Sequence, residues 1–220
     1  MNKKNKSYFP VLIDLTQYKS LVIGGGSIAT RKVLNLLEFG ARPDIISPEI
    51  IDELASLIVS NDLIHKKRKY EVGDANDYNL IFSATGDKQL DELLKEECYG
   101  TGSLLNIADV PQLCNFIMPA TIKRGSFTFS IASQGESPFM VKHLRKKLSA
   151  ELPANLEKIS ELASELRERM FEENIYDKVN QREELIKDFL SIDWYELLDK
   201  IDIEEAKMIV ETMILEYVND

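Results

Sequence analysis

The sequence predicts an α/β fold built on a parallel sheet, followed by a helical C-terminal region. Three observations support this prediction. A short apolar run, Leu21–Ile23, meets three consecutive glycines and then an amphipathic stretch. Further apolar runs alternate with helical stretches up to about residue 107, which is typical of a doubly wound parallel sheet. From Ala154 onward apolar residues recur at three- and four-residue steps, which predicts helices.

The first element is the stretch LVIGGGSIATRK, residues 21–32, which predicts a strand, a glycine turn and a helix ending near Gly40. Gly24, Gly26 and Ala29 spell G-x-G-x-x-A, the fingerprint of Rossmann-type dinucleotide-binding folds. The free N–H groups at the helix start would hold the pyrophosphate. A glycine turn without a ligand is the alternative, but the strand before it and the helix after it favour nucleotide binding.

The remaining elements follow in order along the chain. In the first half, strands are expected at Asp44–Ser47, Leu63–Ile64, Asn79–Ser83 and Ser103–Ile107, with helices near 50–59 and 88–99. After Pro111 the pattern changes. Strand-like runs at Phe116–Met118 and Phe127–Ile131, around a turn at Lys123–Gly125, predict an antiparallel pair, and a basic helix at Phe139–Leu148 follows. Residues 154–218 predict one helix and two or three more after it.

Length and charge restrict the possible functions. The 220 residues suffice for one large domain or two small ones. Residues 1–150 carry 19 Lys and Arg against 17 Asp and Glu, whereas residues 151–220 carry 8 against 20, so the net charges are +2 and −12. The acidic tail argues against nucleic acid as the main partner and marks a boundary near Pro153.

No apolar run approaches the ~18 residues that a membrane span requires, so we expect no membrane partner. The start of the chain, MNKKNKSYFPVLIDL, is basic and then apolar, but Pro10 and Asp14 interrupt the apolar run. We therefore expect a cytoplasmic protein without a signal peptide.

The cysteines and histidines are few and widely spaced. Cys98 and Cys114 form no C-x-x-C motif, which predicts buried thiols and no disulfide framework. His65 and His143 are far apart in sequence, so we expect no metal site.

Four segments then occur in the order of a known family. VLIDLTQYKSLVIGGGSIATRKVLNLLEFGA resembles the opening of the sirohaem synthase N-terminal family, the precorrin-2 dehydrogenases, with its GGG-x-x-A-x-x-K motif. LIFSATGD resembles the family's strand ending in A-T-D-D, and LLNIADVPQLCNFIMPATIKRG resembles its N-V-V-D-D-P-x-x-C-x-F-x-x-P-A stretch. SIASQGESPFMVKHLRKKLSAELP is similar to its S-x-G-G-x-S-P segment, so the resemblance covers about residues 8–153.

The resemblance implies a domain plan and an activity. The plan is an NAD-binding Rossmann domain at 1–112, a dimerisation segment at 113–152, and an acidic helical domain at 153–220, in a homodimer. The family uses NAD to remove a hydride from precorrin-2 and yields sirohydrochlorin. Some members also insert ferrous iron to make sirohaem, and the sequence does not distinguish these two types. A third reading is an NAD-sensing regulatory module, which the glycine turn fits equally well.

The cofactor residues come from the resemblance and the fingerprint together. Ser47 stands where many dinucleotide-binding folds carry an Asp or Glu for the ribose, and it is not an arginine, which favours NAD over NADP. The residues expected to bind NAD are Gly24, Gly26, Ser27 and Ile28 at the phosphates, Ser47, Pro48 and Glu49 at the ribose, and Thr85 beside the nicotinamide. The alternative for Thr85 is a hydroxyl that binds only backbone.

Asp109 is the candidate catalytic residue. It aligns with the first Asp of the family's D-D pair and follows a predicted strand, at the edge of the sheet where ligands bind. Loss of a hydride from precorrin-2 is accompanied by loss of a proton, which a carboxylate could accept. An Asp before Val-Pro also often only initiates a turn. Val110 replaces the family's second Asp, which argues against any mechanism that needs two carboxylates.

Substrate binding requires positive charge, because precorrin-2 carries many carboxylates, which arginine binds with paired hydrogen bonds. A solvated basic face is the alternative for each cation, and Ser137 with Pro138 also fits a helix N-cap. Gln134 stands where the family has its first Gly. The residues that the resemblance assigns to the substrate are Asn106, Lys123, Arg124, Ser133, Ser137, His143 and Arg145.

Overall fold

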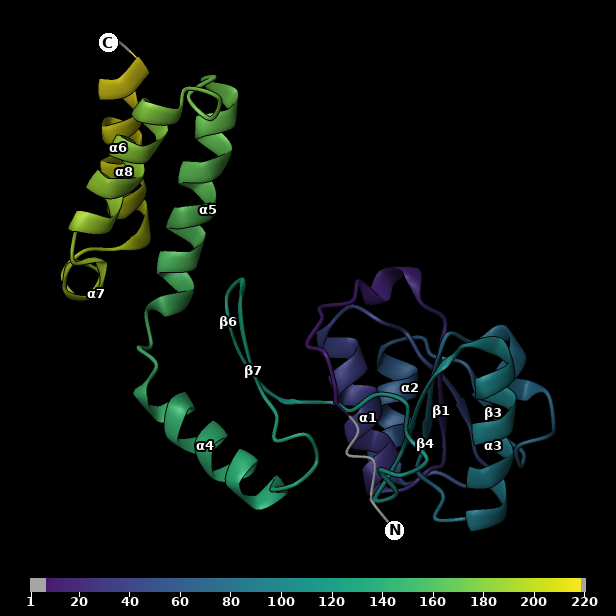
Figure 1. Cartoon of the computed structure of the whole chain (residues 1–220). Helices are drawn as coiled ribbons and strands as arrows, with labels where there is room; N and C mark the ends of the chain where they lie inside the picture. The colour runs from purple at the N-terminus through teal and green to yellow at the C-terminus, as the bar shows by residue number, and fades with distance from the viewer. Residues whose placement is uncertain (1–6, 219–220) are drawn as a thin grey trace. The chain divides into compact units, whose positions relative to one another are not determined.

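The computed structural model describes residues 7–218, which divide into two compact units with the boundary between Met118 and Pro119 (Figure 1). The basic start of the chain considered above, residues 1–6, lies outside the described residues. The expected hairpin and basic helix fall in the second unit with the C-terminal helices. The division into three functional regions stays a prediction.

The first unit is a doubly wound parallel sheet, as the sequence predicts. Its five strands lie in the order β3-β2-β1-β4-β5, and every neighbouring pair is parallel. The strands are β1 (Ser20–Ile23), β2 (Asp44–Ile46), β3 (His65–Lys66), β4 (Leu80–Ser83) and β5 (Leu104–Ile107). The helices are α1 (Ser27–Glu38), α2 (Asp52–Ser60) and α3 (Lys88–Thr101), with short 3-10 turns η1 (Leu15–Gln17) and η2 (Asp74–Asp77).

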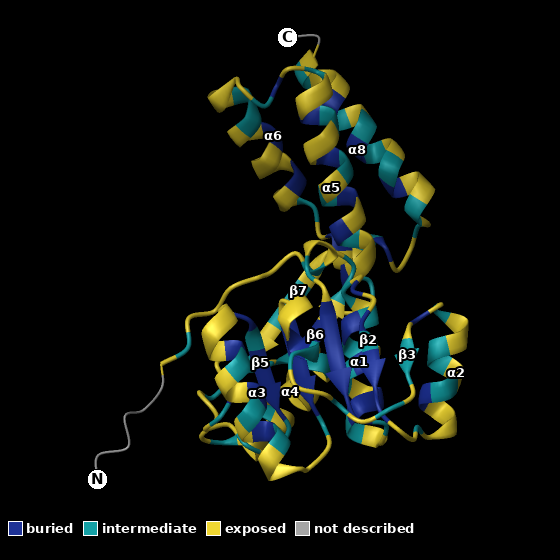
Figure 2. Cartoon of the chain, turned by 90° about the vertical axis from the view of Figure 1, so that its right-hand side faces the viewer, coloured by how far each residue is buried: buried dark blue, intermediate teal, exposed yellow. Residues whose placement is uncertain are grey.

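Alternating strand residues supply two separate apolar cores, one on each face of the sheet. Leu21 and Ile81 pack with Leu94 of α3, while Val22 and Phe82 pack with α1 and α2. Figure 2 shows the central strands buried throughout and the helices buried only toward the sheet. Burial on both faces explains why these strands appear in the sequence as continuous apolar runs.

Two strand predictions in the first unit were wrong. The edge strand comprises His65–Lys66 instead of Leu63–Ile64, because His65 and Lys66 are the residues that stand opposite Ile45 and Ile46 of β2. Phe116–Met118 forms no strand, and Phe116 and Met118 instead pack their side chains against the core of the sheet.

The second unit begins with an antiparallel hairpin of β6 (Ala120–Arg124) and β7 (Phe127–Ile131). The predicted strand Phe127–Ile131 is confirmed, but its partner is Ala120–Arg124 and not Phe116–Met118. Lys123 and Arg124 therefore belong to β6, and Gly125–Ser126 forms the turn. The basic helix α4 (Pro138–Glu151) packs on this hairpin. The remaining helices are α5 (Leu156–Glu172), α6 (Val179–Ser191), α7 (Trp194–Leu197) and α8 (Ile203–Val218).

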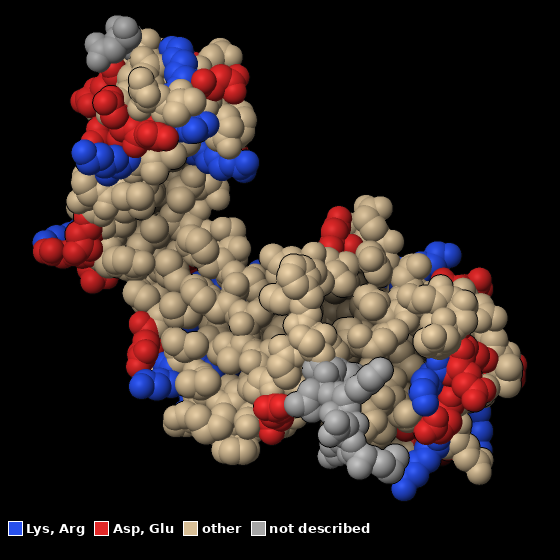
Figure 3. Space-filling view, viewed as in Figure 1, with Lys and Arg blue, Asp and Glu red and all other residues tan. Residues whose placement is uncertain are grey.

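The last four helices enclose a core of their own, which includes Leu162, Leu185, Trp194 and Val210. Their charged residues stay at the surface. On the face shown in Figure 3, Asp and Glu side chains gather, with Lys and Arg among them, where the helices approach the C-terminus. Within residues 7–218, the helices are all too short or too polar to cross a membrane.

Candidate active site

Four segments with predicted binding residues follow strand ends at one edge of the sheet. Gly24–Gly26 follow β1, Ser47–Glu49 follow β2, Ala84–Gly86 follow β4, and Ala108–Asp109 follow β5. The strand order reverses between β1 and β4, so the glycine turn lies at the topological switch point, where open α/β sheets bind their ligands.

Close backbone contacts shape the glycine turn. The Gly24 N–H donates to the Ile46 carbonyl at 2.9 Å, and the Gly25 carbonyl accepts the Ile51 N–H at 3.0 Å. A Cβ atom at Gly24 would lie 2.7 Å from the Ala84 carbonyl oxygen, and one at Gly25 would lie 1.8 Å from that of Glu49. Glycine is required at both positions because neighbouring backbone occupies the space of a side chain.

Gly26 has the opposite environment, and it fits a bound pyrophosphate. A Cβ atom there would meet no atom within 4 Å. Gly26 is the N-cap of α1 and provides no side-chain hydrogen bond, whereas Asp87 caps α3 by accepting the N–H groups of Gln89 and Leu90. The start of α1 therefore has room beside Gly26 and no side-chain capping acceptor, as binding of an anion at a helix N-terminus requires.

At the end of β2, the hydroxyl of Ser47 is buried and donates to the Glu49 carbonyl at 2.6 Å. His65 Nε2 lies 2.9 Å from the Ser47 carbonyl oxygen. Pro48 and Glu49 are exposed. Ser47 thus shapes the segment beside the glycine turn, and Glu49 provides the exposed carboxylate at this strand end. Binding of the ribose here stays a prediction.

Thr85 and Gly86 follow β4 and are exposed. The Thr85 hydroxyl accepts the N–H of Asp87 at 3.1 Å, so it has the backbone role that the sequence left open. A contact with the nicotinamide stays a prediction.

Asp109 is exposed just beyond β5 and has a left-handed backbone, with φ +61°. This conformation is uncommon for residues other than glycine, although Asp adopts it more readily than most residues. Cys114 holds the segment in place, because its sulfur accepts the Ile107 N–H at 3.1 Å and lies 3.4 Å from the Val110 carbonyl oxygen. Cys98 and Cys114 are both free and buried, which confirms their prediction.

Lys32 is a site residue that the sequence analysis did not select. Its ammonium donates to Asn106 Oδ1 at 3.0 Å, and Asn106 is buried near the end of β5. A substrate contact of Asn106 stays a prediction. Burial lowers the pKa of Lys32, as does the neighbouring charge of Arg31, while Cys114 and Asp109 act in the opposite direction. The signal that could have identified Lys32 is its place as the last residue of GGG-x-x-A-x-x-K.

The other predicted substrate residues lie in the second unit, where two of them join α4 to the hairpin. Arg124 donates to the Ser149 hydroxyl at 3.2 Å, and Arg145 Nε donates to the Thr121 carbonyl at 3.1 Å. Lys123 and His143 are exposed. Substrate binding by these cations stays a prediction.

The SQGESP segment forms the turn before α4. Ser133 Oγ accepts the Ser137 N–H at 2.9 Å, and Ser137 occupies the N-cap position without a side-chain capping bond. Gln134 has φ +55° and Gly135 has φ +84°. Gln134 therefore adopts the left-handed backbone that a glycine would adopt more easily. A tetrapyrrole contact of the two serines stays a prediction.

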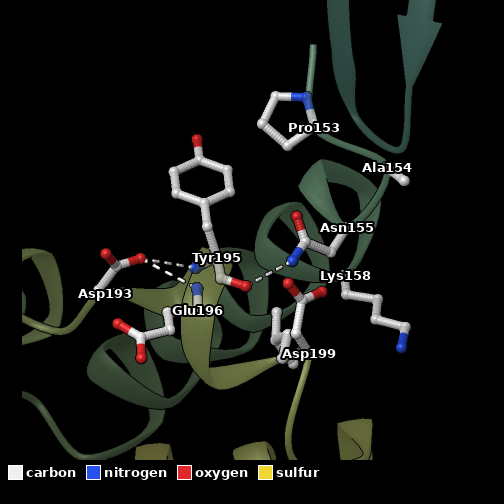
Figure 4. A pocket seen from close by; sticks show the side chains of 9 residues that line it. Pro153, Ala154, Asn155, Lys158, Asp193, Tyr195, Glu196 and Asp199 are labelled. Carbon is white, nitrogen blue, oxygen red and sulfur yellow. Dashed lines mark hydrogen bonds between the residues drawn. The ribbon is translucent and has the colours of Figure 1, made fainter. Parts of the chain in front are cut away.

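A separate hollow of about 740 Å³ lies in the second unit, between the start of α5 and α7 (Figure 4). The Asn155 amide donates to the Tyr195 carbonyl at 2.8 Å, and Asp193 caps α7. Asn155 and Asp193 thus serve local structure, and the hollow is lined by none of the predicted site residues.

Among residues 7–218, no three His, Cys, Asp or Glu side chains are arranged to hold a metal ion.

Comparisons with known proteins agree with this geometry. Residues 11–120 match the family model described as putative NAD(P)-binding. The siroheme synthase of Saccharophagus degradans is 32% identical over 74% of this chain and 35% of its own length. That of Nitrosomonas europaea is 33% identical over 80% of this chain and 35% of its own length. The chain spans about a third of these relatives.

A solved structure matches nearly the whole chain. SirC, a precorrin-2 dehydrogenase, is 25% identical, with a TM-score of 0.77 over 93% of this chain and 100% of that one. The match therefore includes most of the helical region as well as the parallel sheet. We conclude that the chain belongs to the putative NAD(P)-binding family and, within it, to the sirohaem synthase N-terminal proteins.

Proposed function

We propose that this chain is an NAD-dependent dehydrogenase that converts precorrin-2 into sirohydrochlorin. One observation carries the proposal: the uncapped glycine turn and the left-handed Asp109 follow strands of one parallel sheet and lie at the same edge. The names of the similar proteins, siroheme synthase and precorrin-2 dehydrogenase, support the choice of substrate.

In this proposal the residues of the first unit bind the cofactor and accept a proton. NAD, when bound, accepts the hydride. The N–H groups at the start of α1 hold the pyrophosphate beside Gly26, and Glu49 lies at the end where the ribose is expected. The exposed Asp109 carboxylate accepts the proton that the substrate loses, or orients the macrocycle while water accepts it.

The second unit supplies cations for the substrate and leaves apolar residues of α4 uncovered. Lys123, His143 and Arg145 are exposed there and can attract the carboxylates of precorrin-2. Helix α4 buries no residue in the single chain and exposes Phe139 and Leu144. A homodimer in which a second copy covers α4 is therefore part of the proposal. A cytoplasmic location is proposed as well.

The test is an anaerobic assay in which precorrin-2 is generated enzymatically and NADH formation is followed by absorbance. The wild-type chain should form NADH only when precorrin-2 and NAD are both present. Asp109→Ala should lower kcat by about 10²- to 10⁴-fold, the usual contribution of a general base. Asp109→Asn keeps the side-chain shape and the turn, so an equal loss there assigns the effect to the charge.

The other outcomes are also informative. Full activity in both Asp109 variants would make the residue structural in the dehydrogenase. If the wild type binds NAD but forms no NADH with precorrin-2, the activity is refuted and the NAD-sensing module is favoured.

Insertion of ferrous iron as a second substrate is tested separately, by the absorbance of sirohydrochlorin. Val110 leaves Asp109 as the single carboxylate of its segment. Asp109→Ala should therefore abolish any iron insertion along with dehydrogenation.

A further inference from the structure

Between α1 and β5 lies a half-buried cation, Lys32, whose hydrogen-bond partners are uncharged. Lys32 lies in the second turn of α1, whose N-terminus carries the glycine turn. Its ammonium donates to Asn106 Oδ1 at 3.0 Å and to the sulfur of Met118 at 3.6 Å, and it lies 5.2 Å from the centre of the Phe82 ring. These contacts come from three separate segments of the first unit.

The position of the ammonium follows from helix geometry. Long side chains on a helix lean toward its N-terminus, and α1 begins at the edge of the sheet where the parallel strands end. Lys32 therefore reaches toward the candidate active site. A methionine or leucine would fill the same apolar space without the cost of removing a charge from water. The charge therefore requires an explanation other than packing.

Asn106 also makes a hydrogen bond to the segment that contains Asp109. Its amide Nδ2 donates to the Phe116 carbonyl at 3.3 Å, while its Oδ1 accepts from Lys32. Asn106 itself is in β5, three residues before Asp109. Lys32 and Asn106 thus link the helix of the glycine turn to both ends of the segment 107–116.

We infer that Lys32 is a positioning residue, which acts through Asn106 to fix the segment 107–116 and with it the Asp109 carboxylate relative to α1. This inference rests on the proposed dehydrogenase function. A charged donor makes a stronger hydrogen bond than a neutral one, especially away from water, which is why a lysine serves here. Asp109 has a left-handed backbone, and the hydrogen bonds of Cys114 and Asn106 hold the segment around it.

The test replaces Lys32 by Met, which keeps the length and apolar stem of the side chain and removes the charge. Amide hydrogen exchange is measured first, on the chain without added ligand. Lys32→Met should raise exchange in segment 107–116 and leave β1 unchanged. Lys95→Met is the matched control, because Lys95 lies on the outer face of α3 in a surface ion pair with Glu92. It should change neither segment.

Steady-state kinetics then separate positioning from substrate binding. Lys32→Met should lower kcat by about 10- to 100-fold, the loss expected from a misplaced catalytic group, with both KM values within about 3-fold of wild type. A raised KM for precorrin-2 with an unchanged kcat would mean that Lys32 binds the substrate directly, and would overturn the inference.

A double-mutant cycle tests the route through Asn106. Asn106→Leu should reproduce the kinetic loss of Lys32→Met, and the double variant should lose no more than the larger single loss. Additive losses would refute the route. Because Asn106 is buried, the thermal unfolding of each variant is recorded alongside.

The two proposals fail in different ways. An inactive wild type that still binds NAD refutes the dehydrogenase, whereas unchanged hydrogen exchange in Lys32→Met refutes the positioning role.

Discussion

Helices α1 and α4 belong to the same chain, but they differ in how many of their residues are buried. α1 buries Ala29, Thr30, Val33 and Leu36 against the sheet. α4 buries no residue, and Phe139 is 72% exposed. The α/β unit therefore completes its own core within one chain, whereas the hairpin and α4 leave an apolar surface uncovered.

The difference shows that one chain can form its cofactor-binding turn alone, whereas it needs a second surface to bury the apolar residues of α4. The glycine turn is already shaped in the isolated chain, because hydrogen bonds from Gly24 and Ile51 fix it. The exposed apolar residues of α4 require another surface before they are removed from water. Met140, Leu144 and Leu148 are exposed at four-residue steps, which places them on one face of α4. An exposed apolar face of this kind is typical of protein–protein contacts. Three experiments test this comparison.

The largest effect is expected at the glycine turn, from Gly25→Val. A Cβ atom there would lie 1.8 Å from the Glu49 carbonyl oxygen, so the backbone after β2 must move. We expect the free energy of unfolding of the α/β unit to fall by at least about 3 kcal/mol, at the upper end of overpacking costs. Urea denaturation followed by circular dichroism measures the change.

Gly26→Val is the matched variant one residue later. Its Cβ would meet no atom within 4 Å, and φ at this position is −91°. We expect a loss of stability below about 1 kcal/mol, as for other N-cap changes. The affinity for NAD, measured by calorimetry, should fall at least about 10-fold, which corresponds to 1.4 kcal/mol. Unchanged affinity in the folded variant would contradict the assignment of the pyrophosphate site.

The second experiment concerns the uncovered surface of α4. Leu144 on α4 is 40% exposed and Leu34 on α1 is 42% exposed, so the two leucines are matched in residue type and exposure. If a second copy covers α4, Leu144→Glu places a charge in the dimer interface. The dimer dissociation constant should then rise at least about 10-fold, or 1.4 kcal/mol. Sedimentation velocity over a concentration series measures it.

Leu34→Glu should leave the sedimentation profile unchanged, because no dimer contact is proposed for α1. A dimer that withstands Leu144→Glu, or one that dissociates equally in both variants, would show that α4 is not the interface.

Much of the α/β unit was predictable from sequence because its signals are local. Strands buried on both faces are continuous apolar runs, and the glycine turn needs only residues 24–29. Boundaries were less accurate where long-range contacts decide them. The run Phe116–Met118 is apolar because Phe116 and Met118 pack onto the sheet, and not because it forms a strand. The two-residue edge strand β3 is likewise fixed by its pairing with β2.

The candidate site was predictable in its chain positions but not in its interactions. The strand-end rule placed Asp109 and the glycine turn at one edge of the sheet. No local pattern shows that Lys32 reaches Asn106, since the two residues are 74 positions apart. The structural bonds of Arg124 and Arg145 were equally hidden, because a basic face has the same sequence whether its cations bind substrate or backbone.

The smallest expected effect concerns the burial of carboxylates, which differs between the two units. Asp91 on α3 is 2% exposed, and it is the one buried Asp, Glu, Lys or Arg among the described residues. The helical unit keeps its many carboxylates at the surface. Burial raises the pKa of Asp91, although its hydrogen bond from the Ser83 hydroxyl at 2.7 Å acts against this.

Because the pKa of Asp91 is higher in the folded than in the unfolded chain, the folded state favours the protonated carboxyl group. Its contribution to stability is complete below the unfolded pKa of about 4 and is lost as the pH rises through the folded pKa. Asp91→Asn keeps an acceptor for Ser83 and removes this titration. The thermal midpoint of the variant should therefore match that of wild type below about pH 4 and exceed it as the pH rises through the folded pKa of Asp91. Glu96→Gln is the control for removal of an exposed carboxylate from the same helix. A gap between Asp91→Asn and wild type that narrows as the pH rises would mean that the charged form of Asp91 is the one that stabilises the α/β unit.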